Sequence, residues 1–241
     1  MEKPVLFKIE NGIGIITLNR PHRSNAINQD LLTHLFDCIE EVAGNNEIMV
    51  GIITGNGNSF CSGIDLAAVE TDNLLNPRGD GTDFMDVIHA CKKLIIGAIN
   101  GHTITGGLEI ALNCDFLIAS ERASFRDTHA RIGICPGWGM TQLLQQAVGL
   151  RMAKQISFTG EPISAQSALR CGLVNEVVPH EQLMERSRHI AMDICAANQD
   201  VLAVQKDLME FRSNATLDEA LAHERKRCME ITGKSWGGSS S

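Results

Sequence analysis

Tyrosine is absent from this sequence of 241 residues, and aromatic residues make up only 4% of it. Hydrophobic residues still reach 44%, so an aliphatic core is expected. No apolar run approaches the ~20 residues that a membrane-spanning helix needs, and we expect no membrane partner. Length and composition are those of a globular protein with one large domain, or with one domain and a small appendage.

Positive charge is scarce as well. Lysine and arginine number 21 against 29 aspartates and glutamates, which gives a formal net charge of −8. A protein of this charge is poorly suited to binding the phosphates of nucleic acids, so we expect no nucleic-acid partner. The balance leaves room for an anionic small molecule held by a local cluster of basic residues.

The eight cysteines form no C-x-x-C pair. A chain of this length can bury its own core without disulfides, so we expect reduced cysteines in a cytoplasmic protein. The first residues show no basic stretch followed by an apolar one, which argues against a secretory signal. The cysteine spacing also argues against a structural zinc site, and we expect no metal.

Strands and helices are expected to alternate in the first part of the chain. Apolar runs at residues 5–9 and 13–18 flank Asn11-Gly12, which is typical of a hairpin. Further strands are expected at residues 50–54, 94–99 and 116–119, and helices at residues 28–42, 84–93 and 107–113. From about residue 139 helical spacing dominates, over residues 139–148, 151–158, 164–170, 180–197, 199–211 and 216–231. This order predicts an α/β fold with right-handed crossovers and a helical end.

Two glycine-containing segments each follow an expected strand, SFCSGIDL at 59–66 and INGHTITGGLEIAL at 99–112. Gly63 permits a sharp turn that leaves the amide of Ile64 free, and Gly106 opens a helix whose first amides lack internal partners. If the segments face each other, two N–H groups could bind one oxygen anion. The alternative is that both are ordinary turns between a strand and a helix, because such glycine patterns are common.

Two stretches hold groups suited to acid–base chemistry. Glu109 lies among apolar residues, where the proton affinity of a carboxylate can be tuned. The run FRDTHARIG at 125–133 places an acid, a hydroxyl, an imidazole and a guanidinium within five positions. If this run is extended, Asp127, His129 and Arg131 share a face. If it is helical, Asp127 and His129 are not expected to face each other.

Together these segments resemble the crotonase superfamily, the enoyl-CoA hydratase/isomerase family. The resemblance runs from about residue 5 to 230 and rests on five motifs in the family's order. They are NRPHRSNAIN (19–28), GIITGNGNSFCSGIDL (51–66), INGHTITGGLEIALNCDFLIAS (99–120), ASFRDTHARIGICPGWGMTQLL (123–144) and AKQISFTGEPISAQSALRCGLVNEVV (153–178). The resemblance implies a spiral of β-β-α repeats at 1–190, followed by helices at 191–235 that mediate trimer contacts. The low-complexity tail at 236–241 is expected to be disordered.

The family binds acyl-CoA thioesters and holds an enolate oxygen between two backbone amides, which by resemblance belong to Ile64 and Gly106. Its hydratases use two glutamates, one that deprotonates water and one that exchanges a proton at the α-carbon. Glu109 matches the first. His129 stands at the position of the second, which departs from the family. Histidine, with an ordinary pKa of about 6.5, can donate a proton near neutral pH. The alternative is that His129 lines the pocket or bonds a backbone carbonyl.

The resemblance also implies where coenzyme A binds. Arg20 and Arg23 could meet its phosphates, or both could lie in a solvated loop. Trp138 and the polar stretch 70–83, expected to be a mobile loop, would shape the acyl pocket, although Trp138 suits the core equally well. Asp65 matches a family position that is more structural than catalytic. The expected binding residues are Arg20, Arg23, Ser24, Ala26, Ser62, Gly63, Asp65 and Trp138.

These matches imply the addition of water to a trans-2-enoyl-CoA to give a 3-hydroxyacyl-CoA, with no cofactor besides the CoA of the substrate. The alternatives are an enoyl-CoA isomerase, a thioester hydrolase and a non-catalytic acyl-CoA-binding protein. The missing second glutamate keeps the last of these open. A homotrimer, or a hexamer of two trimers, is the assembly usual in the family.

Overall fold

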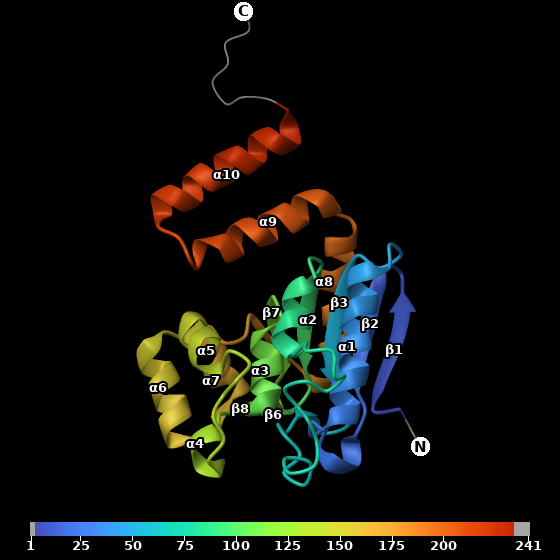
Figure 1. Cartoon of the computed structure of the whole chain (residues 1–241), viewed down its shortest axis with the longest axis vertical. Coiled ribbons are helices and arrows are strands. Elements are labelled where there is room, and N and C mark those ends of the chain that lie inside the picture. The colour runs from blue at the N-terminus through green and yellow to red at the C-terminus, as the bar shows by residue number, and fades with distance from the viewer. Residues whose placement is uncertain (1–2, 234–241) are drawn as a thin grey trace, which may run out of the picture. The chain divides into compact units, whose positions relative to one another are not determined.

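The computed structural model describes residues 3–233. The chain divides into two compact units, one ending at Ala196 and the other beginning at Ala197. In the first unit, two strands followed by a helix occur four times in succession, from β1 to α4 (Figure 1). This order confirms the predicted α/β fold of β-β-α repeats.

A six-stranded sheet forms the larger layer, in the order β1-β2-β3-β5-β7-β10. Its strands are β1 (Val5–Glu10), β2 (Ile13–Leu18), β3 (Val50–Gly55), β5 (Leu94–Ile99), β7 (Phe116–Ser120) and β10 (Glu176–Val178). β1 and β2 form the predicted antiparallel hairpin, and the other neighbours pair in parallel. β3 and β5 are almost wholly buried, which accounts for their continuous aliphatic sequence.

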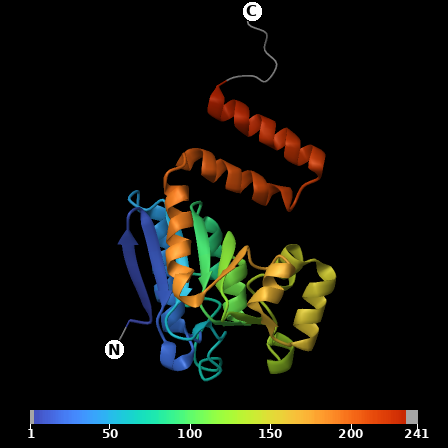
Figure 2. The same ribbon diagram turned by 180° about the vertical axis from the view of Figure 1, so that it is seen from behind.

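Helices cover both faces of this sheet (Figures 1 and 2). One face carries α1 (Gln29–Gly44), α2 (Phe84–Ala90) and α3 (Gly106–Leu112), and the other carries α8 (Leu183–Cys195). Each face buries its own hydrophobic cluster. α1 begins where the Asn28 side chain accepts a hydrogen bond from the Leu31 amide.

A second sheet, not predicted from the sequence, has the order β4-β6-β8-β9. Its strands are β4 (Ser59–Cys61), β6 (His102–Ile104), β8 (Ser124–Arg126) and β9 (Ile163–Ser164). The first three run parallel to one another. Strands of two or three residues are too short to show an alternating hydrophobic pattern, so periodicity does not reveal them. This small sheet determines which loops meet.

The segment 70–83 forms an irregular loop, as predicted, and its side chains bind α1. Arg78 pairs with Asp37 and Glu40 at 2.6 and 2.7 Å, and its guanidinium lies 5.3 Å from the centre of the Phe36 ring. The amide of the Gln29 side chain donates to the carbonyl of Pro77 at 2.7 Å. These contacts hold the loop against α1.

The remaining helices of the first unit follow β8. They are the short helix α4 (His129–Ile132), then α5 (Met140–Val148), α6 (Leu150–Thr159) and α7 (Ala165–Arg170). Two 3-10 turns, η1 (Pro21–Arg23) and η2 (His180–Gln182), complete it. The structure divides the helix predicted at 180–197 into two elements. The tight 3-10 turn η2 follows Pro179, and α8 comes directly after it.

The second unit consists of α9 (Gln199–Arg212) and α10 (Leu217–Thr232). Asn198 caps α9, and Thr216 with Glu219 forms a capping box on α10. The predicted helical end is thus present, and its role in trimer contacts stays a prediction. The tail predicted to be disordered, 236–241, lies outside the described residues. Within residues 3–233, no helix has both the length and the hydropathy to cross a membrane.

Candidate active site

Three short parallel strands end side by side and are each followed by a segment with candidate catalytic groups. β4 leads to Gly63 and Ile64, β6 leads to Gly106 and Glu109, and β8 leads to His129. The carboxyl ends of parallel strands are where α/β proteins commonly place their sites. The small sheet therefore gathers segments that are far apart in the sequence.

The loops around Gly63 and Gly106 touch backbone to backbone. A Cβ atom on Gly63 would lie 2.8 Å from the carbonyl oxygen of Ile104 and 3.4 Å from the amide nitrogen of Gly106. Gly63 also has a φ of 89°, which favours glycine. A Cβ on Gly107 would lie 2.2 Å from the carbonyl oxygen of Cys61, so glycine is needed there as well. The close approach of the two loops depends on these glycines.

The amides of Ile64 and Gly106 are available to a ligand. The backbone of Ile27 binds the two neighbours of Ile64. Its carbonyl accepts from the amide of Asp65, and its amide donates to the carbonyl of Gly63, both at 2.8 Å. In a parallel bridge this turns the N–H of Ile64 away from Ile27. Gly106 is the first residue of α3, where amides lack acceptors within the helix. Neither amide has an acceptor among residues 3–233.

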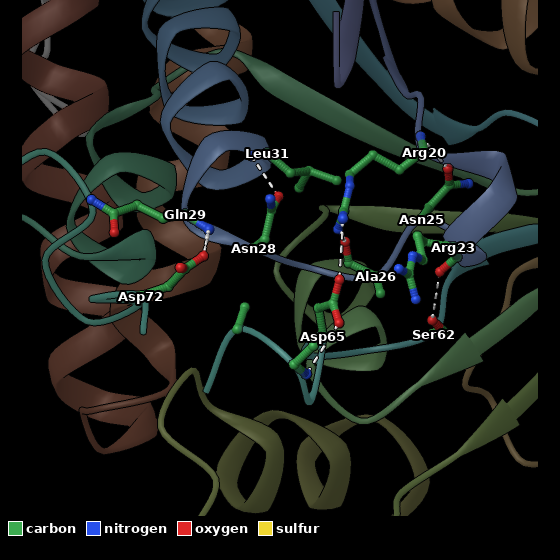
Figure 3. A network of polar contacts seen from close by, with 12 residues as sticks. Arg20, Arg23, Asn25, Ala26, Asn28, Gln29, Leu31, Ser62, Asp65 and Asp72 are labelled. Carbon is green, nitrogen blue, oxygen red and sulfur yellow. Dashed lines mark hydrogen bonds and ion pairs between the residues drawn. The ribbon is translucent and has the colours of Figure 1, made fainter. Parts of the chain in front are cut away.

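Arg20 ties the segment before α1 to the loop that holds Ile64 (Figure 3). Its guanidinium donates to the carbonyl of Ala26 at 2.5 Å and pairs with Asp65 at 3.1 Å. The amide of Ser62 donates to the carbonyl of Ser24 at 3.0 Å, which joins the same two segments. Seven of the eight predicted binding residues take part in these bonds or directly adjoin them. They are Arg20, Arg23, Ser24, Ala26, Ser62, Gly63 and Asp65.

Glu109 lies in α3 with only 2% of its surface exposed. Its Oε1 accepts hydrogen bonds from the amides of Trp138 at 2.8 Å and Met140 at 3.3 Å. Both amides lie at the N-terminus of α5, where the partial positive charge of a helix favours a carboxylate. Sequence reasoning missed these two donors, although the predicted start of a helix at residue 139 was a signal for free amides. The carboxylate is therefore buried, and the two backbone amides bind Oε1 and leave Oε2 for other groups.

Trp138 contributes its backbone rather than its indole ring to Glu109. The ring is buried and packs on Phe84 with their centres 5.4 Å apart. The carbonyl of Trp138 accepts from the side chain of Asn113 at 2.9 Å. Of the two predicted roles for Trp138, the ring thus occupies the core, and the same residue still reaches the site through its amide.

His129 faces Glu109 and Asp127 with its two ring nitrogens. Nε2 lies 3.5 Å from Oε2 of Glu109, and Nδ1 lies 2.8 Å from Oδ1 of Asp127. All three residues are less than 5% exposed. The FRDTHARIG run is thus part of the same site as Glu109.

The segment is neither wholly extended nor wholly helical, and Asp127 faces the ring of His129. His129 is the first residue of α4, and Asp127 precedes the helix, so its carboxylate turns back onto the first helical residue. Oδ1 of Asp127 also accepts from the His129 amide at 3.0 Å. Arg131 does not join this face, because its guanidinium binds Glu161 at 2.8 Å and the carbonyl of Thr159.

The charges around His129 favour the imidazolium form. Burial alone would lower the pKa of His129, but the hydrogen bonds to Asp127 and Glu109 and their negative charges outweigh it and raise the pKa to about 9. Burial opposes ionisation of Asp127 too, yet hydrogen bonds from His129 and Ser157 lower its pKa. At neutral pH the site therefore holds a protonated imidazole between two carboxyl groups.

A family model described as enoyl-CoA hydratase/isomerase matches residues 8–235. The chain belongs to this family. A probable peroxisomal enoyl-CoA hydratase of Arabidopsis thaliana is 37% identical over 91% of this chain and 83% of its own length. The short-chain-enoyl-CoA hydratase of Clostridium acetobutylicum is 36% identical over 91% of this chain and 86% of its own.

Solved structures of this family share the fold. An enoyl-CoA hydratase from Mycobacterium avium is 39% identical, with a TM-score of 0.77, over 95% of this chain and 99% of that one. A structure from Geobacillus kaustophilus has a TM-score of 0.89 at 30% identity, over 96% of this chain and 90% of that one. These likenesses confirm the family and the fold predicted from the sequence. This family member brings Ile64, Gly106, Glu109 and His129 together through β4, β6 and β8.

Proposed function

We propose that this chain adds water to trans-2-enoyl-CoA thioesters and produces 3-hydroxyacyl-CoA. The observation that supports it most is the buried Glu109 carboxylate, 3.5 Å from Nε2 of His129, beside the paired loops of Ile64 and Gly106. Relatives named enoyl-CoA or crotonyl-CoA hydratase match 91 to 97% of the chain at 35 to 37% identity. They confirm the predicted enzyme class.

The thioester oxygen binds the amides of Ile64 and Gly106. As water adds to the β-carbon, negative charge moves onto this oxygen and forms an enolate. Two fixed amides stabilise that charge without rearranging, which lowers the barrier more than it strengthens substrate binding. The thioester and the amides together provide the activation, so the reaction uses no cofactor other than the CoA of the substrate.

Glu109 and His129 transfer the two protons. Oε2 of Glu109 takes a proton from water while the water oxygen bonds the β-carbon. The imidazolium of His129 then gives its proton to the α-carbon as the enolate collapses. Glu109 ends protonated and His129 ends neutral. A proton passing from Oε2 of Glu109 to Nε2 of His129, across the 3.5 Å that separates them, restores the starting state.

Arg23 is the better placed of the two arginines to bind the phosphates of coenzyme A. Arg20 already binds Ala26 and Asp65, and its side chain is only 16% exposed. Arg23 is exposed beside Ser24 at the surface. In this proposal Arg20 shapes the loop, Arg23 supplies the charge, and backbone groups near Ser24 and Ala26 contact the adenine end.

The assembly and the compartment are further parts of the proposal. A homotrimer or a hexamer built through α9 and α10 would cover their exposed apolar side chains, among them Met209, Phe211 and Leu221. A cytoplasmic location stays a prediction from the reduced cysteines.

The experiment that tests the proposal is incubation of the protein with crotonyl-CoA. Loss of the conjugated enoyl-thioester absorbance, together with a gain of one water in the mass of the product, is the expected result. Release of free CoA would mark a hydrolase, and interconversion of 3-enoyl-CoA and 2-enoyl-CoA without water would mark an isomerase. Saturable binding with no change in the thioester would mark a non-catalytic binding protein. Each of the last three results would contradict the proposal.

A further inference from the structure

Thr105 has a backbone conformation that a β-branched residue rarely adopts. Its φ is 52° and its ψ is −113°, at the position just before α3. A side chain branched at Cβ is strained in this region of positive φ. Such strain persists only where surrounding contacts enforce it, and it is common at functional sites. The contacts of Thr105 must therefore hold it in this conformation.

The side chain of Thr105 forms a hydroxyl pair with Thr128. The Oγ1 atoms of the two threonines lie 2.5 Å apart, and Oγ1 of Thr105 accepts from the amide of Thr128 at 3.1 Å. The backbone amide of Thr105 donates to the carbonyl of Arg126 at 2.8 Å. Thr105 is only 2% exposed. Its hydroxyl is thus bound in the interior to the segment that follows β8.

This pair joins the two halves of the site. Thr105 immediately precedes Gly106, whose amide binds the thioester oxygen in the proposed reaction, and Thr128 immediately precedes His129. Thr105 also packs on the loop of the other amide, because a Cβ on Gly63 would lie 3.3 Å from its own Cβ. One side chain therefore contacts all three segments that the small sheet brings together.

We propose that Thr105 is a positioning residue, which fixes the amide of Gly106 relative to His129 through its hydroxyl contact with Thr128. The inference rests on the proposed hydration. In the enolate, the oxygen and the α-carbon are separated by one carbon atom, so the amide and the imidazole have to be placed together. A displacement of 1 Å in such a site can lower the rate on the order of 100-fold.

Two substitutions separate the hydroxyl from the backbone. Thr105→Ser keeps the hydroxyl, and Thr105→Ala removes it while leaving a Cβ at the same φ. With crotonyl-CoA as substrate, we expect Thr105→Ala to lower kcat by about 10- to 100-fold with KM within about threefold, and Thr105→Ser to stay within about threefold in both. Thr128→Ala should reproduce the loss of kcat. It also keeps the test decisive if Thr105→Ala does not fold.

Thr103→Ala is the matched control. Thr103 is buried on β6, two residues before Thr105, but its hydroxyl donates to the carbonyl of Gly101 at 3.1 Å rather than to the site. Its removal should leave kcat unchanged even where it lowers the melting temperature. Equal losses of kcat in Thr103→Ala and Thr105→Ala, or full activity in both Thr105→Ala and Thr128→Ala, would overturn the inference.

Binding of acetoacetyl-CoA separates this inference from the proposed function. Its β-ketoacyl group can bind as an enolate, which requires the amide pair but no turnover. If the wild-type protein fails to hydrate crotonyl-CoA, the proposed function fails, and the affinity for acetoacetyl-CoA still reports on Thr105. We expect Thr105→Ala to weaken this binding about tenfold or more relative to Thr105→Ser. Equal affinities of the two variants would overturn the positioning role.

Discussion

Oδ1 of Asp127 lies 2.8 Å from Nδ1 of His129, while the opposite ring nitrogen faces Glu109. A neutral imidazole carries one proton and can donate to only one of these carboxylates. The imidazolium carries a proton on each ring nitrogen and can donate to both. His129 thus occupies the position at which family hydratases are expected to carry a second glutamate. The negative charges of Asp127 and Glu109 keep the imidazole of His129 protonated.

The pH dependence of hydration follows from the raised pKa of His129. Its protonated form is the active one, so kcat should be level at neutral pH and fall as pH rises through about 9. Asp127→Asn keeps the size of the side chain and removes its charge, so the fall should begin at lower pH. The measurement is kcat against pH for both proteins, and an alkaline fall at the same pH in both would contradict the role of Asp127.

The same shift makes His129 a contributor to stability. Its pKa in the folded protein lies above its ordinary value of about 6.5, so its stabilising effect is complete below that pH and is lost as pH rises through about 9. The difference in melting temperature between the wild-type protein and His129→Gln should therefore shrink between these two pH values. A difference that stays constant over this range would show that His129 is not charged in the folded state.

Replacing Glu109 with glutamine should abolish hydration and preserve binding. The amide oxygen of glutamine can still accept from Trp138 and Met140, so the fold is expected to stay intact, but it cannot take a proton from water. We expect kcat to fall by about 100- to 10,000-fold, with the affinity for the product within about threefold. Glu161→Gln is the surface control, because Glu161 pairs with Arg131 away from the site. Retained turnover in Glu109→Gln would remove Glu109 from the mechanism.

Arg20 and Arg23 should respond differently to substitution. Arg20→Gln breaks a mostly buried pair with Asp65 and a bond to Ala26, so the free energy of unfolding should fall by about 1–3 kcal/mol. Arg23→Gln should leave stability unchanged and raise KM several-fold, with an effect that weakens as salt increases. Thermal unfolding and KM at two salt concentrations test both. A stability loss in Arg23→Gln without a change in KM would contradict the proposed contact with phosphate.

Much of the site could be predicted from sequence because its residues belong to recognisable motifs. Glu109 and Gly106 lie in one such motif, and the buried face of α1 follows from its helical spacing. The small sheet could not be predicted, because β4, β6 and β8 have three residues each. The pairing of Arg20 with Asp65 joins residues 45 positions apart, and no local pattern encodes it. Almost any residue type can provide a backbone donor such as the amide of Trp138, so the sequence does not mark it.

The proton transfer by His129 is tested most directly by hydrating crotonyl-CoA in D2O with the wild-type protein and with His129→Gln. The control is His102→Gln, because His102 is exposed on β6 and bonds Ser124 instead. We expect the wild-type product to carry a hydroxyl group on the β-carbon and one deuterium on the α-carbon. We expect His129→Gln to slow its formation by about 100-fold or more, and His102→Gln to have no effect. Equal rates for the wild-type protein and His129→Gln would show that His129 does not deliver the proton.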